Sequence, residues 1–246
     1  MTAEPSSTVD PSELHQFNAS AGVWWNTSGV AKWLHKLNPV RVDYILDLVA
    51  RTFGRPDGQD LRGLRILDLG CGAGVFCEPL AQRGAAVTGV DPAPSLIDEA
   101  RGHARKMGLA IDYRCATPEA LARGGETFDV VLSLDVAEHV ADSALLVALC
   151  ARLVSPGGLV ILSTMNRTWK SYVQVIALGE YVLRFLPRGT HRWDRFIKPA
   201  EIRAMPGLEG FEFVELKGLT MNLRTWRLEM SGNSDVTYFI ALRRPA

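Results

Sequence analysis

The sequence predicts a doubly wound α/β domain of the Rossmann-like type, and three observations lead to that prediction. From residue 65 onward, short apolar runs alternate with stretches of helical periodicity, the order that builds a parallel sheet covered by helices. Gly70, Gly72 and Gly74 follow the first apolar run, where a loop lets the backbone approach a ligand closely. Asp91 ends the second run, at the sheet edge where such domains bind cofactors. Together these features predict a nucleoside-cofactor site.

The elements follow in chain order. We expect strands at 65–70, 86–91, 110–115, 128–134 and 158–164, and helices at 75–83, 94–107 and 142–153. Two later strand-like runs, at 211–216 and 236–242, would complete a sheet of seven strands as a final antiparallel hairpin.

The chain divides into an N-terminal helical cap, residues 1–60, and a main domain, residues 61–246. Residues 1 to about 10 are polar, and we expect them to be disordered. A helix should begin near Pro11, and apolar residues with helical spacing from Val42 to Val49 predict another, after a break at Asn38–Pro39. A helical insertion at about 166–191 follows the fifth strand.

Composition narrows the class of protein. The 246 residues include 27 Lys plus Arg and 27 Asp plus Glu, so no overall basic field favours a nucleic-acid partner. The four cysteines have no zinc-site spacing. The polar N-terminus lacks a signal-peptide core, and no window has the roughly 20 apolar residues of a membrane span. We therefore expect a cytoplasmic protein.

The glycine spacing distinguishes between cofactors. A dinucleotide fingerprint has the form G-x-G-x-x-G, whereas this loop has alternating glycines preceded by Asp68. The arrangement resembles motif I of class I methyltransferases, which implies that Asp68, Gly70 and Gly72 surround the methionine part of S-adenosylmethionine and that Asp91 binds its ribose. A nicotinamide enzyme is the less favoured alternative.

Three further stretches resemble the ubiquinone-biosynthesis O-methyltransferases: HKLNPVR at 35–41, LDVAEHV at 134–140 and RGTHRWDRFIKPAEI at 188–202. The resemblance implies a seven-stranded class I methyltransferase that acts on a polyprenylated phenol or catechol and associates with other enzymes of ubiquinone biosynthesis. It also implies cofactor contacts at Arg41, Gly70, Asp91 and Leu134. The guanidinium of Arg41 matches the cofactor carboxylate, and Leu134 replaces a methionine of some members by another large apolar side chain.

Asp135, Glu138 and His139 follow the fourth predicted strand, and the resemblance implies that they bind Mg²⁺. Two carboxylates and an imidazole could hold a divalent ion, although the histidine suits manganese or zinc better than magnesium. His139 could instead be the general base that deprotonates a phenol. Acidic residues also stabilise a helix N-terminus without any ligand, so these interpretations stay open at this point.

The segment 169–188 combines apolar and aromatic side chains with flanking positive charges. This pattern fits an interfacial helix that brings the enzyme to the inner face of a membrane, and equally a lid packed on the protein itself. Two other functions also fit the fold: another small-molecule O- or N-methyltransferase, and a non-catalytic S-adenosylmethionine-binding subunit.

Overall fold

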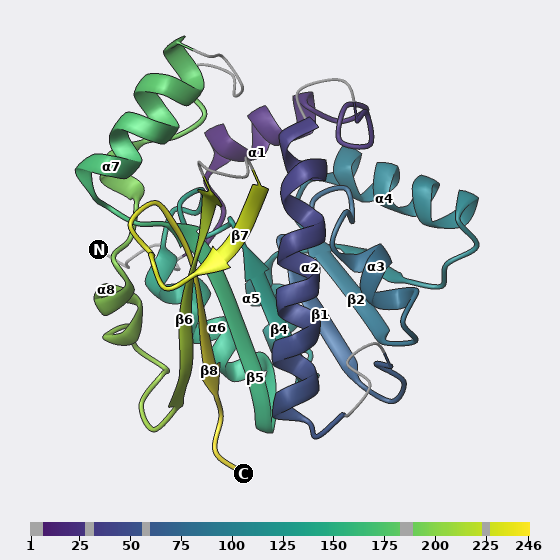
Figure 1. Cartoon of the computed structure of the whole chain (residues 1–246). Coiled ribbons are helices and arrows are strands. Elements are labelled where there is room, and N and C mark those ends of the chain that lie inside the picture. The colour runs from purple at the N-terminus through teal and green to yellow at the C-terminus, as the bar shows by residue number, and fades with distance from the viewer. Residues whose placement is uncertain (1–6, 28–31, 56–59, 183–188, 223–226) are drawn as a thin grey trace, which may run out of the picture.

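The computed structural model of the protein describes residues 7–27, 32–55, 60–182, 189–222 and 227–246. Its described strands form one twisted sheet in the order β3-β2-β1-β4-β5-β8-β6-β7, with helices on both faces (Figure 1). The strands are β1 (Arg65–Leu69), β2 (Ala86–Asp91), β3 (Asp112–Cys115), β4 (Phe128–Leu134), β5 (Val154–Met165), β6 (Glu212–Asn222), β7 (Arg227–Ser231) and β8 (Thr237–Arg243). The predicted α/β class is confirmed.

The first five strands are parallel, with β1 between β2 and β4. β8 runs antiparallel to β5 and to β6 on its other side. The prediction of seven strands was wrong by one, because β7 pairs antiparallel with β6 and adds an eighth strand. β7 carries Arg227 and Glu229 and none of its residues is fully buried, so an edge strand of this kind has a weak apolar pattern.

The helices are α1 (Pro11–Ala19), α2 (Lys32–Thr52), α3 (Cys77–Ala81), α4 (Pro94–Lys106), α5 (Pro118–Arg123), α6 (Ser143–Leu153), α7 (Trp169–Ser171) and α8 (Pro199–Arg203). Two less regular segments, η1 (Tyr172–Val182) and η2 (Trp193–Arg195), lie between α7 and α8. Of the predicted insertion, about 166–191, the structure describes residues 166–182, which include α7 and η1, and residues 189–191; residues 183–188 lie outside the described residues. α5 was not predicted, because its single short turn carries too little periodicity.

The predicted break at Asn38–Pro39 was wrong, since α2 continues through Pro39. A proline inside a helix costs about 3 kcal/mol. Ile45, Leu46 and Val49 of the same helix are at most 1% exposed and pack in the core. Each such side chain stabilises the fold by about 1.5–3 kcal/mol, which outweighs the cost of the proline.

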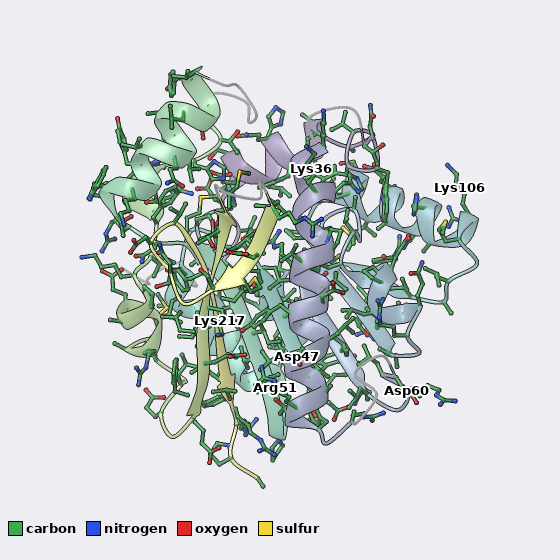
Figure 2. All side chains as sticks on the ribbon, viewed as in Figure 1. Lys36, Asp47, Arg51, Asp60, Lys106 and Lys217 are labelled. Atoms are coloured by element: carbon green, nitrogen blue, oxygen red, sulfur yellow. The ribbon has the colours of Figure 1, made fainter. Side chains whose placement is uncertain are left out.

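Alternate residues of the central strands fill two apolar layers, one on each face of the sheet. Ile66 of β1 belongs to the layer shared with α2, and Leu67 belongs to the layer shared with α6. α2 is also tied to the C-terminal strands, because Arg51 donates to Glu215 of β6 and to Asp47 one turn earlier (Figure 2).

α1 and the insertion lie at the end of the sheet where the parallel strands have their carboxyl ends (Figure 1). Asn18, in the last turn of α1, accepts from the hydroxyl of Ser95 at the start of α4. Thr8 is 1% exposed, and its carbonyl accepts from the amide of Ala141 at 2.9 Å. The expected disorder therefore does not extend to residues 7–10, because these contacts order them.

Candidate active site

The loop between β1 and α3 takes its shape from glycines with positive φ, 83° at Gly70, 53° at Gly72 and 82° at Gly74. A Cβ atom at Gly70 would overlap Val136, and one at Gly74 would overlap the Tyr113 hydroxyl. Apart from its own chain neighbours, no heavy atom of the described residues lies within 4 Å of a Cβ built on Gly72. Packed side chains therefore fill the space beside Gly70 and Gly74, whereas the space beside Gly72 is open. This open space suits a ligand that lies against the backbone of the loop.

Asp91 ends β2 and faces this loop. Its Oδ2 accepts from the Gly72 amide at 3.0 Å, and its Oδ1 accepts from the Ala93 amide at 2.8 Å. Burial raises the pKa of Asp91, although these two bonds oppose the shift. The carboxylate is thus fixed beside the open part of the loop, where the sequence predicted a ribose contact.

Asp68 lies within β1, and its side chain is almost fully buried. Its Oδ2 accepts from Cys77 Sγ, 3.3 Å away at the start of α3. Burial raises the pKa of Asp68 to about 7. The structure therefore places Asp68 next to the loop but directs it toward a thiol, and its predicted contact with a cofactor stays a prediction.

Arg41 of α2 reaches the carboxyl ends of β4 and β5. Its side chain is 2% exposed, and Nη2 donates to Asp135 Oδ2 and to Ser163 Oγ. The guanidinium carbon lies 5.0 Å from the ring centroid of Phe76 and 5.4 Å from that of Phe239. Burial would raise the pKa of Asp135, but the charge of Arg41 and the hydrogen bonds from Arg41 and Ser163 together lower it. Arg41 thus lies in the predicted site, paired with a protein carboxylate.

The three residues predicted to bind a metal are each engaged by the protein. Asp135 accepts from Arg41 and Ser163, Glu138 Oε2 accepts from Thr164 Oγ1 at 2.7 Å, and His139 Nδ1 lies 3.0 Å from Glu13 Oε2. No group of three His, Cys, Asp or Glu side chains within the described ranges could hold a metal ion. This arrangement does not fit a bound ion.

His139 lies between the N-terminal cap and the sheet. Its ring meets Phe17 of α1 edge to face, with 5.2 Å between centroids. Burial lowers the pKa of His139, but the hydrogen bond to Glu13 and the nearby carboxylates together outweigh it, so the pKa is raised. Glu138 is also buried, and its Oε1 has no hydrogen-bond partner among the described residues. Leu134, which ends β4 just before this cluster, packs in the core at 8% exposure.

The structure brings further residues to the site whose contacts the sequence did not predict. Trp25 Nε1 donates to the Ala73 carbonyl at 3.1 Å, and its ring stacks on His103 with 3.4 Å between centroids. The N-terminal segment is thereby fixed against the glycine loop. His139 also contacts two residues from distant parts of the chain: Glu13 lies 3.0 Å from its Nδ1, and the ring of His191 lies 5.6 Å from its own ring between centroids. His191 lies within the stretch 188–202, which was singled out as a motif without a role for its histidine.

Comparisons with known proteins agree with this geometry. Residues 67–162 match a family described as a methyltransferase domain. Magnesium protoporphyrin IX methyltransferase from Synechocystis, solved with bound S-adenosylmethionine, superposes with a TM-score of 0.62 at 22% identity, covering 98% of this chain and all of that one. The fold is thus that of the class I methyltransferases.

Full-length relatives specify the family. The ubiquinone biosynthesis O-methyltransferase of Azorhizobium caulinodans is 49% identical over 98% of this chain and 95% of its own length. The protein of the same name from Roseobacter denitrificans is 46% identical over 98% of this chain and 99% of its own. This chain belongs to the ubiquinone biosynthesis O-methyltransferase family.

Proposed function

We propose that this enzyme transfers the methyl group of S-adenosylmethionine to a phenolic hydroxyl of a polyprenylated catechol, a precursor of ubiquinone. The observation that carries the proposal is the full-length similarity to relatives of that name, at 49% and 46% identity. The glycine loop and Asp91 support it, because they form an open backbone cradle beside a fixed carboxylate.

In this proposal Asp91 binds the ribose hydroxyls of the cofactor, and the backbone at Gly70 and Gly72 contacts its methionine part. Arg41 binds the cofactor carboxylate by adjusting its pairing with Asp135, whose side chain is one-third exposed. The cofactor supplies an electrophilic methyl group. The protein supplies alignment, which in well-oriented reactions contributes about 7–11 kcal/mol.

The acceptor hydroxyl must also lose its proton, because a phenol with a pKa near 10 is almost entirely neutral at pH 7. The cluster around Asp135 and His139 lies after β4, at the sheet edge where open α/β domains bind ligands. We place the catechol there, with His139 near the oxygen that is methylated.

The insertion supports a peripheral membrane contact. Among its described residues, the exposed large apolar and aromatic side chains are Trp169, Tyr172, Val173, Leu178, Tyr181 and Val182. Exposed apolar side chains gathered on one segment are typical of interaction surfaces, and a lipid surface is where a polyprenyl tail resides. None of the described helices is long and apolar enough to cross a membrane.

Flotation with anionic liposomes tests this contact. Trp169→Ser with Tyr181→Ser should reduce the bound fraction, whereas Met107→Ser, an exposed apolar residue at the end of α4, should not. Equal binding of both variants would exclude the insertion as the membrane surface. Co-purification of pathway enzymes with tagged protein tests the further proposal of association with them.

Transfer of a labelled methyl group from S-adenosylmethionine to a short-tail demethylubiquinol tests the proposed reaction. Methylated quinol should form with the wild-type protein and be absent without the acceptor. Binding of S-adenosylmethionine without turnover of any catechol would overturn the proposal and favour a non-catalytic subunit. Parallel reactions with a chelator test the ion: lost turnover that magnesium restores would support a metal site, and unchanged turnover would exclude one.

A further inference from the structure

The insertion contains one carboxylate that its apolar surroundings do not explain. Glu180 of η1 is 0% exposed, although neighbouring Tyr181 and Val182 are more than half exposed. A buried carboxylate is costly unless it is hydrogen-bonded. Glu180 accepts from the Gly189 amide at 2.7 Å, the His191 amide at 2.9 Å and His191 Nδ1 at 2.9 Å. The carboxylate is therefore committed to the short segment 189–191.

These bonds also specify the state of the His191 ring. A carboxylate only accepts hydrogen bonds, so Nδ1 carries the ring proton in the neutral imidazole and Nε2 keeps a free lone pair. Nε2 has no hydrogen-bond partner among the described residues. The same logic operates wherever a buried carboxylate holds a catalytic histidine in one tautomer.

The His191 ring lies close to the proposed acceptor site. The His191 ring centroid lies 5.6 Å from that of His139, and its side chain is 7% exposed. The groups that face it are Glu180 from η1, and His139 and Asp135 from the segment after β4. His191 therefore extends from the insertion to the acceptor end of the proposed site.

We propose that His191, held by Glu180, is the general base that accepts the proton of the acceptor hydroxyl. This inference rests on the proposed function and specifies which residue performs its proton transfer. Glu180 is a positioning residue, and His139, already paired with Glu13, stabilises the negative charge that develops on the oxygen.

The step balances as follows. The acceptor O–H bond breaks and its proton passes to His191 Nε2, giving an imidazolium. The oxygen uses its electron pair to form a bond to the methyl carbon, and the S–C bond breaks with its electron pair retained on sulfur. The products are the methyl ether and S-adenosylhomocysteine, and the imidazolium later releases its proton to solvent.

The test uses His191→Asn, because the asparagine amide keeps a donor for Glu180 and lacks an atom equivalent to Nε2. Each protein is assayed with demethylubiquinol and with a nitro-substituted catechol whose hydroxyl is already ionised at pH 7. With demethylubiquinol, kcat should fall 10²–10³-fold, the range for removing a general base. With the ionised catechol it should fall less than tenfold, and the KM for S-adenosylmethionine should not change.

Two further variants complete the experiment. Glu180→Gln should lower kcat with demethylubiquinol about tenfold or more, and added imidazole should partly restore the His191→Asn enzyme. His15→Ala, an exposed histidine of α1, is the matched control and should leave both reactions unchanged.

An equal fall in kcat with both acceptors, or a kcat with demethylubiquinol within threefold of wild type, would show that His191 is not the general base. The Glu180–His191 pair would then only hold the segment 189–191 in place. A variant that fails to fold is detected by its thermal unfolding curve, and His191→Gln then replaces it in the same comparison. Absence of methyl transfer by the wild-type enzyme with either acceptor would overturn the proposed function instead.

Discussion

Replacing Asp135 should destabilise the protein more than replacing Arg41, its partner in the ion pair. The Arg41 side chain is 2% exposed, whereas that of Asp135 is 33% exposed. Asp135→Asn leaves a buried guanidinium without a countercharge, and its Nε already lacks a partner among the described residues. Breaking a buried pair by removing one partner costs about 3–5 kcal/mol, and the remaining amide oxygen reduces this to about 3 kcal/mol.

Arg41→Met should cost less, about 1–2 kcal/mol. The methionine keeps the apolar packing between the rings of Phe76 and Phe239 but loses the cation–π attraction and the bonds to Asp135 and Ser163. Asp135 still accepts from the Ser163 hydroxyl and is one-third exposed to solvent. Asparagine is chosen at position 135 because the backbone there has a φ of 56°, which asparagine tolerates.

Urea unfolding at pH 7 without cofactor measures both losses. Asp47→Asn is the control, since it breaks an ion pair on the exposed side of α2 whose members are 53% and 64% exposed (Figure 2). That change should cost less than about 0.5 kcal/mol. An Arg41→Met protein that is as unstable as Asp135→Asn would refute the argument from unequal burial.

Three further outcomes follow from the loop and the cap. Asp68 keeps its proton up to about pH 7 in the folded protein but loses it near pH 4 when unfolded, so wild-type stability falls across that window. The free energy of unfolding of Asp68→Asn relative to wild type should therefore increase by up to about 1.4 kcal/mol per pH unit between those two pH values. A difference between the two proteins that does not change with pH would contradict this prediction. Gly74→Ala should cost about 2–4 kcal/mol in urea unfolding because its Cβ displaces Tyr113, against about 1 kcal/mol for the equally left-handed but unobstructed Gly108→Ala. Trp25→Phe removes the bond to the glycine loop and should weaken S-adenosylmethionine binding about tenfold by calorimetry. Unchanged affinity would show that this bond does not support the cofactor loop.

Local patterns predicted the core of the fold well. β4 has the predicted bounds, and α4 and α6 begin and end within a residue of the prediction, because each is a strongly periodic segment. The errors lie where local signals are weak or are overridden. β7 is a half-exposed edge strand, and α2 continues through Pro39 because its buried face packs on the sheet.

The residues of the site were likewise predictable only where their position follows from the adjacent sequence. Asp91 and the glycine loop were predictable, since their place follows from a strand, a turn and a helix adjacent in sequence. Glu13 and Glu180 were not predicted, because a carboxylate on a helix reads as an ordinary solvated charge until its partner is known. The partner of Glu13, His139, is 126 residues away.

The sequence by itself determined the class of sheet, the cofactor loop and the family, because each is encoded in contiguous residues whose spacing has a direct structural meaning. Only the tertiary structure decided which charges meet. Arg41 pairs with Asp135 across 94 residues, and the cap and the insertion each bring a glutamate to a histidine of the site. The physical reason is that ion pairs between distant segments form only where packing of the sheet and its helices brings those segments within hydrogen-bonding distance.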